Sequence, residues 1–339
     1  MTRRCHGSMS VSAIPTISKR RSSVHAETER LFFSMISVVL RGAGGIASQL
    51  RRGVAITLLI LFASATGQSQ PQAIPARIVS SSPSITETLF ALGLGDRVVG
   101  VSTYCRYPAA VASLPKVGTF LKPDAEAIAR LKPDLVFVHK GPNNVLAQLG
   151  TLGVRTAVVT PGSLPSVFTT IREISAAANV PERGGFLVGE LNAGLDRVKA
   201  SVAGRTLRKI LIVVGRRTGT LTDIIAVGPG SYLHDIATIA GGVNVLASTA
   251  LEYPRISMET VISLAPDVIV DVGEMGESPA DSDRRRQITE GLWRSQTLVK
   301  AVREGGVHAV HDEAFVVPGP RIVEVARTMA RWLHGVDPR

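Results

Sequence analysis

Cysteine is almost absent from this chain of 339 residues, which contains only Cys5 and Cys105. Because no CxxC pair occurs, the sequence offers neither a thiolate metal site nor a redox dithiol. Aromatic residues are also few, at 4% of the sequence. Each aromatic residue in a predicted loop is therefore informative about where a ligand binds.

The common catalytic motifs are missing as well. The sequence has no GxSxG elbow, no P-loop and no HExxH motif, so no nucleophile and base can be paired by motif. His308 and His311 flank a predicted strand end, but no clear carboxylate accompanies them. The acidic residues between 271 and 283 are typical of a solvated loop. We predict no enzymatic activity, no cofactor and no bound metal.

The basic excess of the chain is confined to its N-terminus. The formal net charge is +11, yet residues 1–65 contain nine Lys/Arg and two Asp/Glu, and the remaining 29 basic and 25 acidic residues give only +4. No basic helix and no alternation of aromatic with basic residues stands out in that remainder. Nucleic acid is therefore not a predicted partner.

One apolar run stands out, residues 54–63. Arg51 and Arg52 precede it, and small residues at 63 and 65 follow it, which is the pattern of a secretory signal peptide. The run is shorter than the about 20 apolar residues of a membrane span. We predict export to the periplasm, and an uncleaved N-terminal anchor is the alternative.

The predicted leader covers residues 1–65 and is long for a signal peptide. A start at Met35 would give an ordinary length, which makes residues 1–34 a candidate for a misassigned start. Removal of the leader also removes Cys5. Cys105 is then alone, so the mature protein has no internal disulfide despite an oxidising compartment.

Two similar stretches lie 133 residues apart. Both are predicted to form a short amphipathic helix, a Pro-Asp turn and a buried strand, because proline ends a helix and a short apolar run suits a parallel sheet. The recurring residues are Glu126, Leu131, Pro133 and Asp134, repeated as Glu259, Leu264, Pro266 and Asp267.

A second pair of similar stretches occurs in the same order along the chain. Residues 83–93 and 229–241 each combine a turn, a helix and a closing glycine, the residue that most easily takes the left-handed conformation after a helix. Helix–turn–strand units of this kind build doubly wound α/β domains. The two pairs of similar stretches therefore predict two similar lobes, with chance similarity between α/β units as the alternative.

The predicted fold class is α/β, with two Rossmann-like lobes, central parallel sheets and one long linking helix. Apolar residues recur every three or four positions between 187 and 202, which indicates a helix of about 30 Å if it has about 20 residues. The predicted layout is a leader at 1–65, a tether at 66–76, an N-terminal lobe at 77–180, the linking helix at 181–204 and a C-terminal lobe at 205–339.

Loops at the carboxyl ends of parallel strands form the ligand crevice of open α/β sheets. Two such lobes facing one another are predicted to enclose a cleft. Three of the four tyrosines fall on its predicted rims, and aromatic rims suit a large flat ligand. The candidate ligand-binding residues are Tyr104, Tyr107, Phe120, His139, Arg216, Arg217, Tyr253 and Phe315.

Glu126 and Glu259 form a separate candidate site. Each lies early in its repeated helix, where a carboxylate interacts favourably with the helix dipole. The alternative is that the two lobes present one glutamate each to a pseudo-symmetric partner. Two ion pairs far apart would set the orientation of that partner more than raw affinity.

Several stretches together resemble the periplasmic substrate-binding proteins of ABC importers for iron–siderophores, haem and vitamin B12, and most closely the cobalamin-binding group. The resemblance covers residues 77–335. It is carried by Ser102-Thr-Tyr-Cys-Arg-Tyr-Pro108, Val117-Gly-Thr-Phe120, Leu131-Lys-Pro-Asp-Leu135, Gly228-Pro-Gly-Ser231, Ala240-Gly-Gly-Val-Asn244 and Pro318-Gly-Pro-Arg321.

The resemblance implies a monomer that holds its small-molecule ligand between two lobes and delivers it to a permease in the inner membrane. It implies that Glu126 and Glu259 contact arginines of that permease. Phe120, His139 and Tyr253 stand where the cobalamin binder has tryptophans. An acidic–basic pair of that group is incomplete here, since Glu313 matches the acid but Val317 replaces the base.

Cobalamin or a related corrinoid is therefore the first choice of ligand. Haem and an anionic ferric siderophore are alternative ligands, because Arg216 and Arg217 could contact the haem propionates or the anionic groups of the siderophore. A carrier of a bare metal ion using His139 and His311 is a further alternative, as is an enzyme with its site at the strand ends.

Overall fold

The computed structural model describes residues 73–140, 144–160, 162–273 and 282–338, all of them within one compact unit, Pro71–Arg339. The apolar run at 54–63, Cys5 and most of the predicted tether lie outside the described residues. Over the described ranges, none of the helices has both the length and the apolar character needed to cross a membrane.

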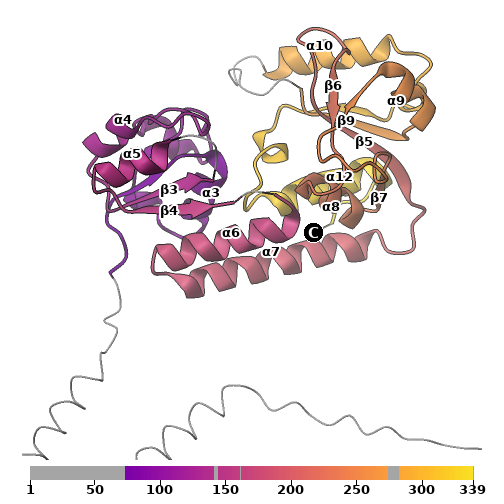
Figure 1. Ribbon diagram of the computed structural model, residues 1–339. Coiled ribbons are helices and arrows are strands. Elements are labelled where there is room, and N and C mark those ends of the chain that lie inside the picture. The colour runs from indigo at the N-terminus through magenta and orange to yellow at the C-terminus, as the bar shows by residue number, and fades with distance from the viewer. Residues whose placement is uncertain (1–72, 141–143, 161, 274–281, 339) are drawn as a thin grey trace, which may run out of the picture. The chain divides into compact units, whose positions relative to one another are not determined.

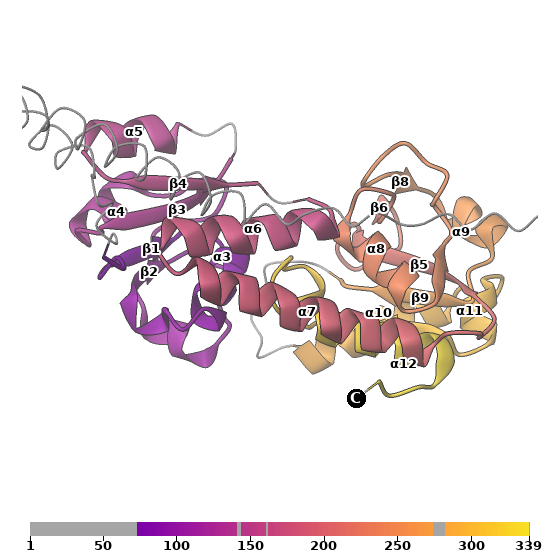
Figure 2. The same ribbon diagram turned by 90° about the horizontal axis from the view of Figure 1, so that it is seen from below.

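The N-terminal lobe, whose strands β3 and β4 are labelled in Figure 1, is built on a parallel sheet. The strand order is β2-β1-β3-β4, as Figure 2 shows. The residues of this sheet are largely β-branched and buried, as expected for strands covered on both faces. The strands are β1 (Ile78–Ser80), β2 (Val98–Val101), β3 (Leu135–His139) and β4 (Thr156–Val159). The all-parallel sheet predicted for this lobe is confirmed.

The helices of this lobe follow its strands. Ser82 caps the first one and accepts a hydrogen bond from the backbone N–H of Ile85, and Asp124 does the same for Ala127, as is typical of N-cap residues. The helices are α3 (Pro83–Ala91), α4 (Ala125–Arg130), α5 (Val145–Thr151) and α6 (Leu164–Ala177), with 3₁₀ turns at Gly95–Arg97 and Ala109–Ser113.

The linking helix is present as α7 (Pro181–Ser201). Pro181 opens it, a position that has no intrahelical use for its missing N–H. Val188, Leu191, Leu195 and Val198 are buried along one face. Figure 2 shows α7 beside α6 and then beside α12 (Ile322–His334), so the helix packs on elements of both lobes.

The C-terminal lobe has a mixed sheet: its central strands are parallel, as predicted, and an antiparallel pair extends one edge. Its order is β10-β9-β5-β6-β8, with β7 also paired to β5, and β6 and β8 run antiparallel to their neighbours. The strands are β5 (Arg208–Gly215), β6 (Ile224–Ala226), β7 (Gly242–Asn244), β8 (Arg255–Ile256), β9 (Val268–Asp271) and β10 (Val307–Ala309).

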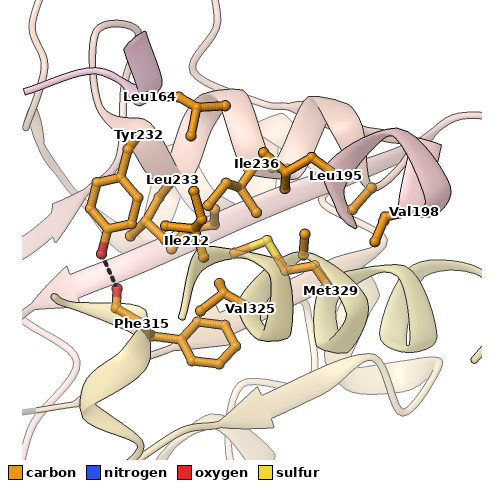
Figure 3. Packing of buried hydrophobic residues seen from close by; sticks show 14 of the residues in the cluster. Leu164, Leu195, Val198, Ile212, Tyr232, Leu233, Ile236, Phe315, Val325 and Met329 are labelled. Carbon is orange, nitrogen blue, oxygen red and sulfur yellow. Dashed lines mark hydrogen bonds between the residues drawn. The ribbon is translucent and has the colours of Figure 1, made fainter. Parts of the chain in front are cut away.

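The remaining helices of this lobe cover the sheet. A helix predicted over residues 285–302 is instead two, α10 (Ser282–Arg294) and α11 (Lys300–Arg303). The others are α8 (Tyr232–Ile239) and α9 (Met258–Leu264), and a 3₁₀ turn occupies Glu313–Phe315. Figure 3 shows α7, α8 and α12 meeting β5 in one core, where Leu195, Ile212, Ile236 and Met329 are packed together.

The sequence repeat has a direct structural counterpart. Oδ2 of Asp134 accepts a hydrogen bond from the backbone N–H of Ala76 at 2.7 Å. Oδ2 of Asp267 accepts one from the backbone N–H of Lys209, also at 2.7 Å. Each Pro-Asp turn thus ties the end of one helix to the start of the lobe's first strand. The glycines predicted to end α3 and α8 take positive φ, +70° at Gly93 and +81° at Gly241.

Candidate ligand-binding site

Four of the predicted ligand-binding residues are aromatic side chains that stand partly out of the surface. Their exposed fractions are 38% for Tyr104, 47% for Tyr107, 40% for Phe120 and 46% for Tyr253. Half-exposed rings keep one face free while the other packs on protein, which suits them to cover a large ligand. The first three belong to the N-terminal lobe and Tyr253 to the C-terminal lobe.

Tyr104 and Phe120 come from neighbouring loops that are fastened together. The backbone N–H of Thr103 donates to the carbonyl of Gly118 at 2.8 Å, and the Thr103 hydroxyl donates to the same oxygen at 3.0 Å. Gly118 has φ +87°, which other residues rarely adopt. The result is an edge-on pair of rings, with centroids 6.5 Å apart.

His139 ends β3 beside the start of α3. Its Nε2 lies 2.7 Å from Oγ of Ser82 and 3.3 Å from Oγ of Ser84. Burial lowers the pKa of His139 from its ordinary 6.5, so the imidazole is neutral at pH 7. The histidine therefore presents a neutral ring.

Tyr253 is anchored by the start of α8. Its hydroxyl donates to Oγ of Ser231 at 3.3 Å, and the same Oγ caps α8 by accepting from the backbone N–H of Leu233. Burial raises the pKa of Tyr253 above its ordinary 10.0. The phenol therefore stays protonated and acts as a hydrogen-bond donor.

Two predicted ligand-binding residues need correction, because the structure buries them. The Arg216 side chain is 3% exposed and its Nε lies 3.1 Å from Oδ2 of Asp271, the last residue of the neighbouring strand β9. Phe315 packs in the core against Trp332, and Figure 3 shows its carbonyl accepting from Tyr232. Neither side chain is on a rim.

The other predicted arginine, Arg217, is exposed but paired. Its Nη2 lies 2.7 Å from Oδ2 of Asp223. His308 stacks on Trp332 with ring centroids 4.6 Å apart. Within the described ranges, no group of three or more His, Cys, Asp or Glu side chains is placed to hold a metal ion.

The two predicted docking glutamates are exposed, one in each lobe. The Glu126 side chain, in the first turn of α4, is 88% exposed. Glu259 is exposed in the first turn of α9. A hydrogen bond from Ser257 and one from its own backbone N–H lower the pKa of Glu259 below its ordinary 4.5. Both positions are accessible to a partner.

Two ion pairs that join the lobes were not predicted from the sequence. Glu87 of α3 pairs with Arg321, just before α12. Arg106, between Tyr104 and Tyr107, pairs with Glu313 at 2.9 Å. One feature of the sequence could have predicted the Glu87 pair. Glu87 is the single charged residue of the helix Pro83–Ala91, and a carboxylate that faces a core usually has a partner.

Comparison with known proteins gives consistent results. Residues 78–314 match the family model described as "Periplasmic binding protein". The vitamin B12-binding protein of Salmonella typhimurium is 30% identical over 263 residues, which are 77% of this chain and 91% of that protein.

Solved structures of similar architecture agree with this assignment. The periplasmic vitamin B12 binding protein BtuF of Vibrio cholerae is 26% identical with a TM-score of 0.62, over 76% of this chain and 96% of that one. The periplasmic heme-binding protein RhuT from Roseiflexus sp. RS-1 is 26% identical with a TM-score of 0.65, over 76% and 97%. The family model alone spans more than two thirds of the chain. The chain belongs to the periplasmic binding protein family of ABC importers, and it is a binding protein rather than an enzyme.

Proposed function

We propose that the protein captures cobalamin or a related corrinoid between its two lobes and delivers it to an inner-membrane permease. The observation that carries this proposal is the set of half-exposed rings described above, contributed by both lobes of a chain that is only 4% aromatic. A corrin ring is large and flat, and rigid aromatic side chains bury much area against such a surface at low entropic cost.

The arginines beside Tyr107 and the predicted site residue Arg217 favour a ligand whose periphery is mostly uncharged, because each of them already has an acidic partner. Arg106, Arg217 and Arg321 each contact a carboxylate at 3.2 Å or less. A guanidinium group already paired with a carboxylate gains less from an anionic ligand. The amide N–H groups at the periphery of a corrinoid can donate to neutral acceptors such as the hydroxyl oxygen of Tyr253, whose proton is donated to Ser231, whereas haem propionates or an anionic siderophore need free positive charge.

Calorimetric titration of the purified protein with cyanocobalamin, haemin and a ferric siderophore tests this proposal. We expect cyanocobalamin to bind most tightly. Phe120→Ala removes one stacking surface and is expected to weaken binding by about tenfold, equivalent to about 1.4 kcal/mol. Phe186→Ala is the matched control, because Phe186 is an exposed ring on α7. No heat with cyanocobalamin would contradict the proposal.

Haem is the second candidate. The heme-binding protein from Roseiflexus is as similar in fold as the cobalamin-binding one. The neutral imidazole of His139 is also the form that coordinates a metal. Haemin binding with a shifted visible absorption band that His139→Gln abolishes would favour haem over a corrinoid.

The remaining parts of the proposal concern location and delivery. The predicted signal peptide would place the mature protein in the periplasm, where the family name also puts such proteins. Glu126 and Glu259 are exposed on separate lobes, as a two-point docking site on a permease requires. Two ion pairs formed together would orient the loaded protein over the permease.

A further inference from the structure

Glu87 and Arg321 form a buried ion pair between the lobes, although 234 residues separate them in the sequence. Nε of Arg321 donates to Oε2 of Glu87 at 2.9 Å, and Nη2 donates to Oε1 at 2.5 Å. The exposed fractions of the two side chains are 2% for Glu87 and 12% for Arg321. This two-bond geometry fixes both the distance and the orientation of the partners.

The pair lies where backbone from both lobes comes close together. A Cβ atom built on Gly319 would lie 3.5 Å from Oε2 of Glu87 and 3.8 Å from Cα of Ser84. The turn before α12 therefore rests directly on the first turn of α3. Because the Glu87 carboxylate is removed from water, burial raises its pKa above the ordinary 4.5, against the opposing effect of Arg321.

Arg321 also contacts a ring of the candidate ligand site. Its Cζ lies 4.3 Å from the centroid of Tyr107, over the face of the ring. Its Nη1 lies 3.2 Å from Oδ1 of Asp312. A side chain held by Glu87 on one side thus supports the Tyr107 ring on the other, and that ring remains 47% exposed.

We propose that Glu87 and Arg321 are positioning residues that hold the two lobes at a fixed separation and hold Tyr107 in place for the ligand. The part concerning the ligand rests on the proposed function. The part concerning lobe separation does not, because it depends only on contacts within the chain. The Arg106–Glu313 pair at 2.9 Å supports the same junction from the next loop.

Distances between spin labels in the ligand-free protein test the first part. Leu152→Cys and Leu298→Cys place labels on exposed positions of the two lobes, in a Cys5→Ser background with the buried Cys105 retained. We expect one narrow distance distribution, which Glu87→Gln broadens. Glu87→Gln keeps the shape of the side chain, so it is preferred to Arg321→Ala, which leaves a buried carboxylate unpaired.

Arg331→Gln is the matched control for this measurement. It removes an exposed arginine–carboxylate pair, with Asp337 at 2.7 Å, that lies wholly within the C-terminal lobe. The control is expected to keep the narrow distribution. A Glu87→Gln distribution as narrow as that of Arg331→Gln would overturn the inference, whatever the ligand is.

A double-mutant cycle with cyanocobalamin tests the second part. Glu87→Gln is expected to weaken binding by about tenfold alone and by less than about twofold in a Tyr107→Ala background, because the effect passes through Tyr107. Equal losses in both backgrounds would overturn the positioning of Tyr107. If the unmodified protein does not bind cyanocobalamin, the proposed function fails, while the distance measurement still decides the role of the ion pair.

Discussion

His139 is a partly buried histidine whose pKa lies below its ordinary 6.5, chiefly because of desolvation. The unfolded chain takes up a proton as the pH falls through 6.5, whereas the folded protein resists protonation until a lower pH. The unfolded state then binds more protons, so the free energy of unfolding decreases on acidification through that window. Above it both states are neutral and His139 contributes no pH dependence.

His139→Gln should therefore flatten the acid side of the stability profile. Urea unfolding between pH 8 and pH 5 would measure the slope, to which one histidine contributes at most about 1.4 kcal/mol per pH unit. His308 and His311 also have lowered pKa values, chiefly because of burial, so a smaller slope should remain. An unchanged slope in the variant would show that His139 is not responsible.

The exposure of individual residues was predictable from the sequence when they lay in loops of unusual composition. Tyr104 and Phe120 are examples, since both rings are partly exposed as expected for a rim, while their contact with a ligand stays a prediction. Arg216 was misplaced because its partner, Asp271, lies 55 residues away on the neighbouring strand. Only the pairing of β5 with β9 brings the two together, and the sequence contains no local sign of that pairing.

At the scale of one element, the glycines of α7 differ in their expected effect on stability, because only some of them are needed for close packing. Gly184, Gly185, Gly189 and Gly194 all lower helix propensity. Yet a Cβ at Gly184 would collide with Oγ of Ser175 on α6, and one at Gly194 would lie 2.9 Å from both γ carbons of Val323 on α12. These two glycines allow close packing with the helices of both lobes.

Substitutions in α7 can separate these roles. A Cβ atom built on Gly189 would have no atom within 4 Å. Gly189→Ala should therefore raise the free energy of unfolding by about 0.5–1 kcal/mol, because alanine has the higher helix propensity. Gly184→Ala should lower it by about 1–3 kcal/mol, because overpacking outweighs the gain in propensity. Thermal or urea unfolding measures both, and equal effects of the two substitutions would contradict this account.

Element boundaries that depend on tertiary contacts were the least predictable. The helix predicted over 285–302 breaks between Arg294 and Lys300 although no proline lies there. Val299, at the break, is fully buried in the core formed around Trp293. The short strands β6 and β8 were missed because two or three residues carry no periodic signal.

Over the whole molecule, duplication was the most reliable sequence signal. Helix–turn–strand units recur at a fixed spacing. In each Pro-Asp turn the aspartate, Asp134 or Asp267, accepts a hydrogen bond from the backbone at the start of the lobe's first strand. The repeat did not predict which residues join the two lobes. Glu87 and Arg321 have no repeated counterpart, because the junction joins different parts of the two lobes.

The repeated glutamates give a prediction at this scale. Reversing both charges, with Glu126→Arg and Glu259→Arg, should abolish delivery to the permease, because each docking point would change from attraction to repulsion. Affinity for the ligand should stay within about twofold, since both side chains are exposed and neither is among the residues proposed to contact the ligand. Uptake of labelled cyanocobalamin by cells with the cognate importer, together with calorimetry, measures the two properties separately.

Glu182→Arg is the matched control, because Glu182 is also an exposed glutamate in the first turn of a helix, α7. A general effect of added positive charge would reduce uptake in this variant too, whereas docking at two defined points would leave it unchanged. Each single reversal should retain part of the uptake, because one ion pair still orients the protein. Normal uptake by the double variant would contradict docking, and a loss of ligand affinity would assign the two glutamates a structural role instead.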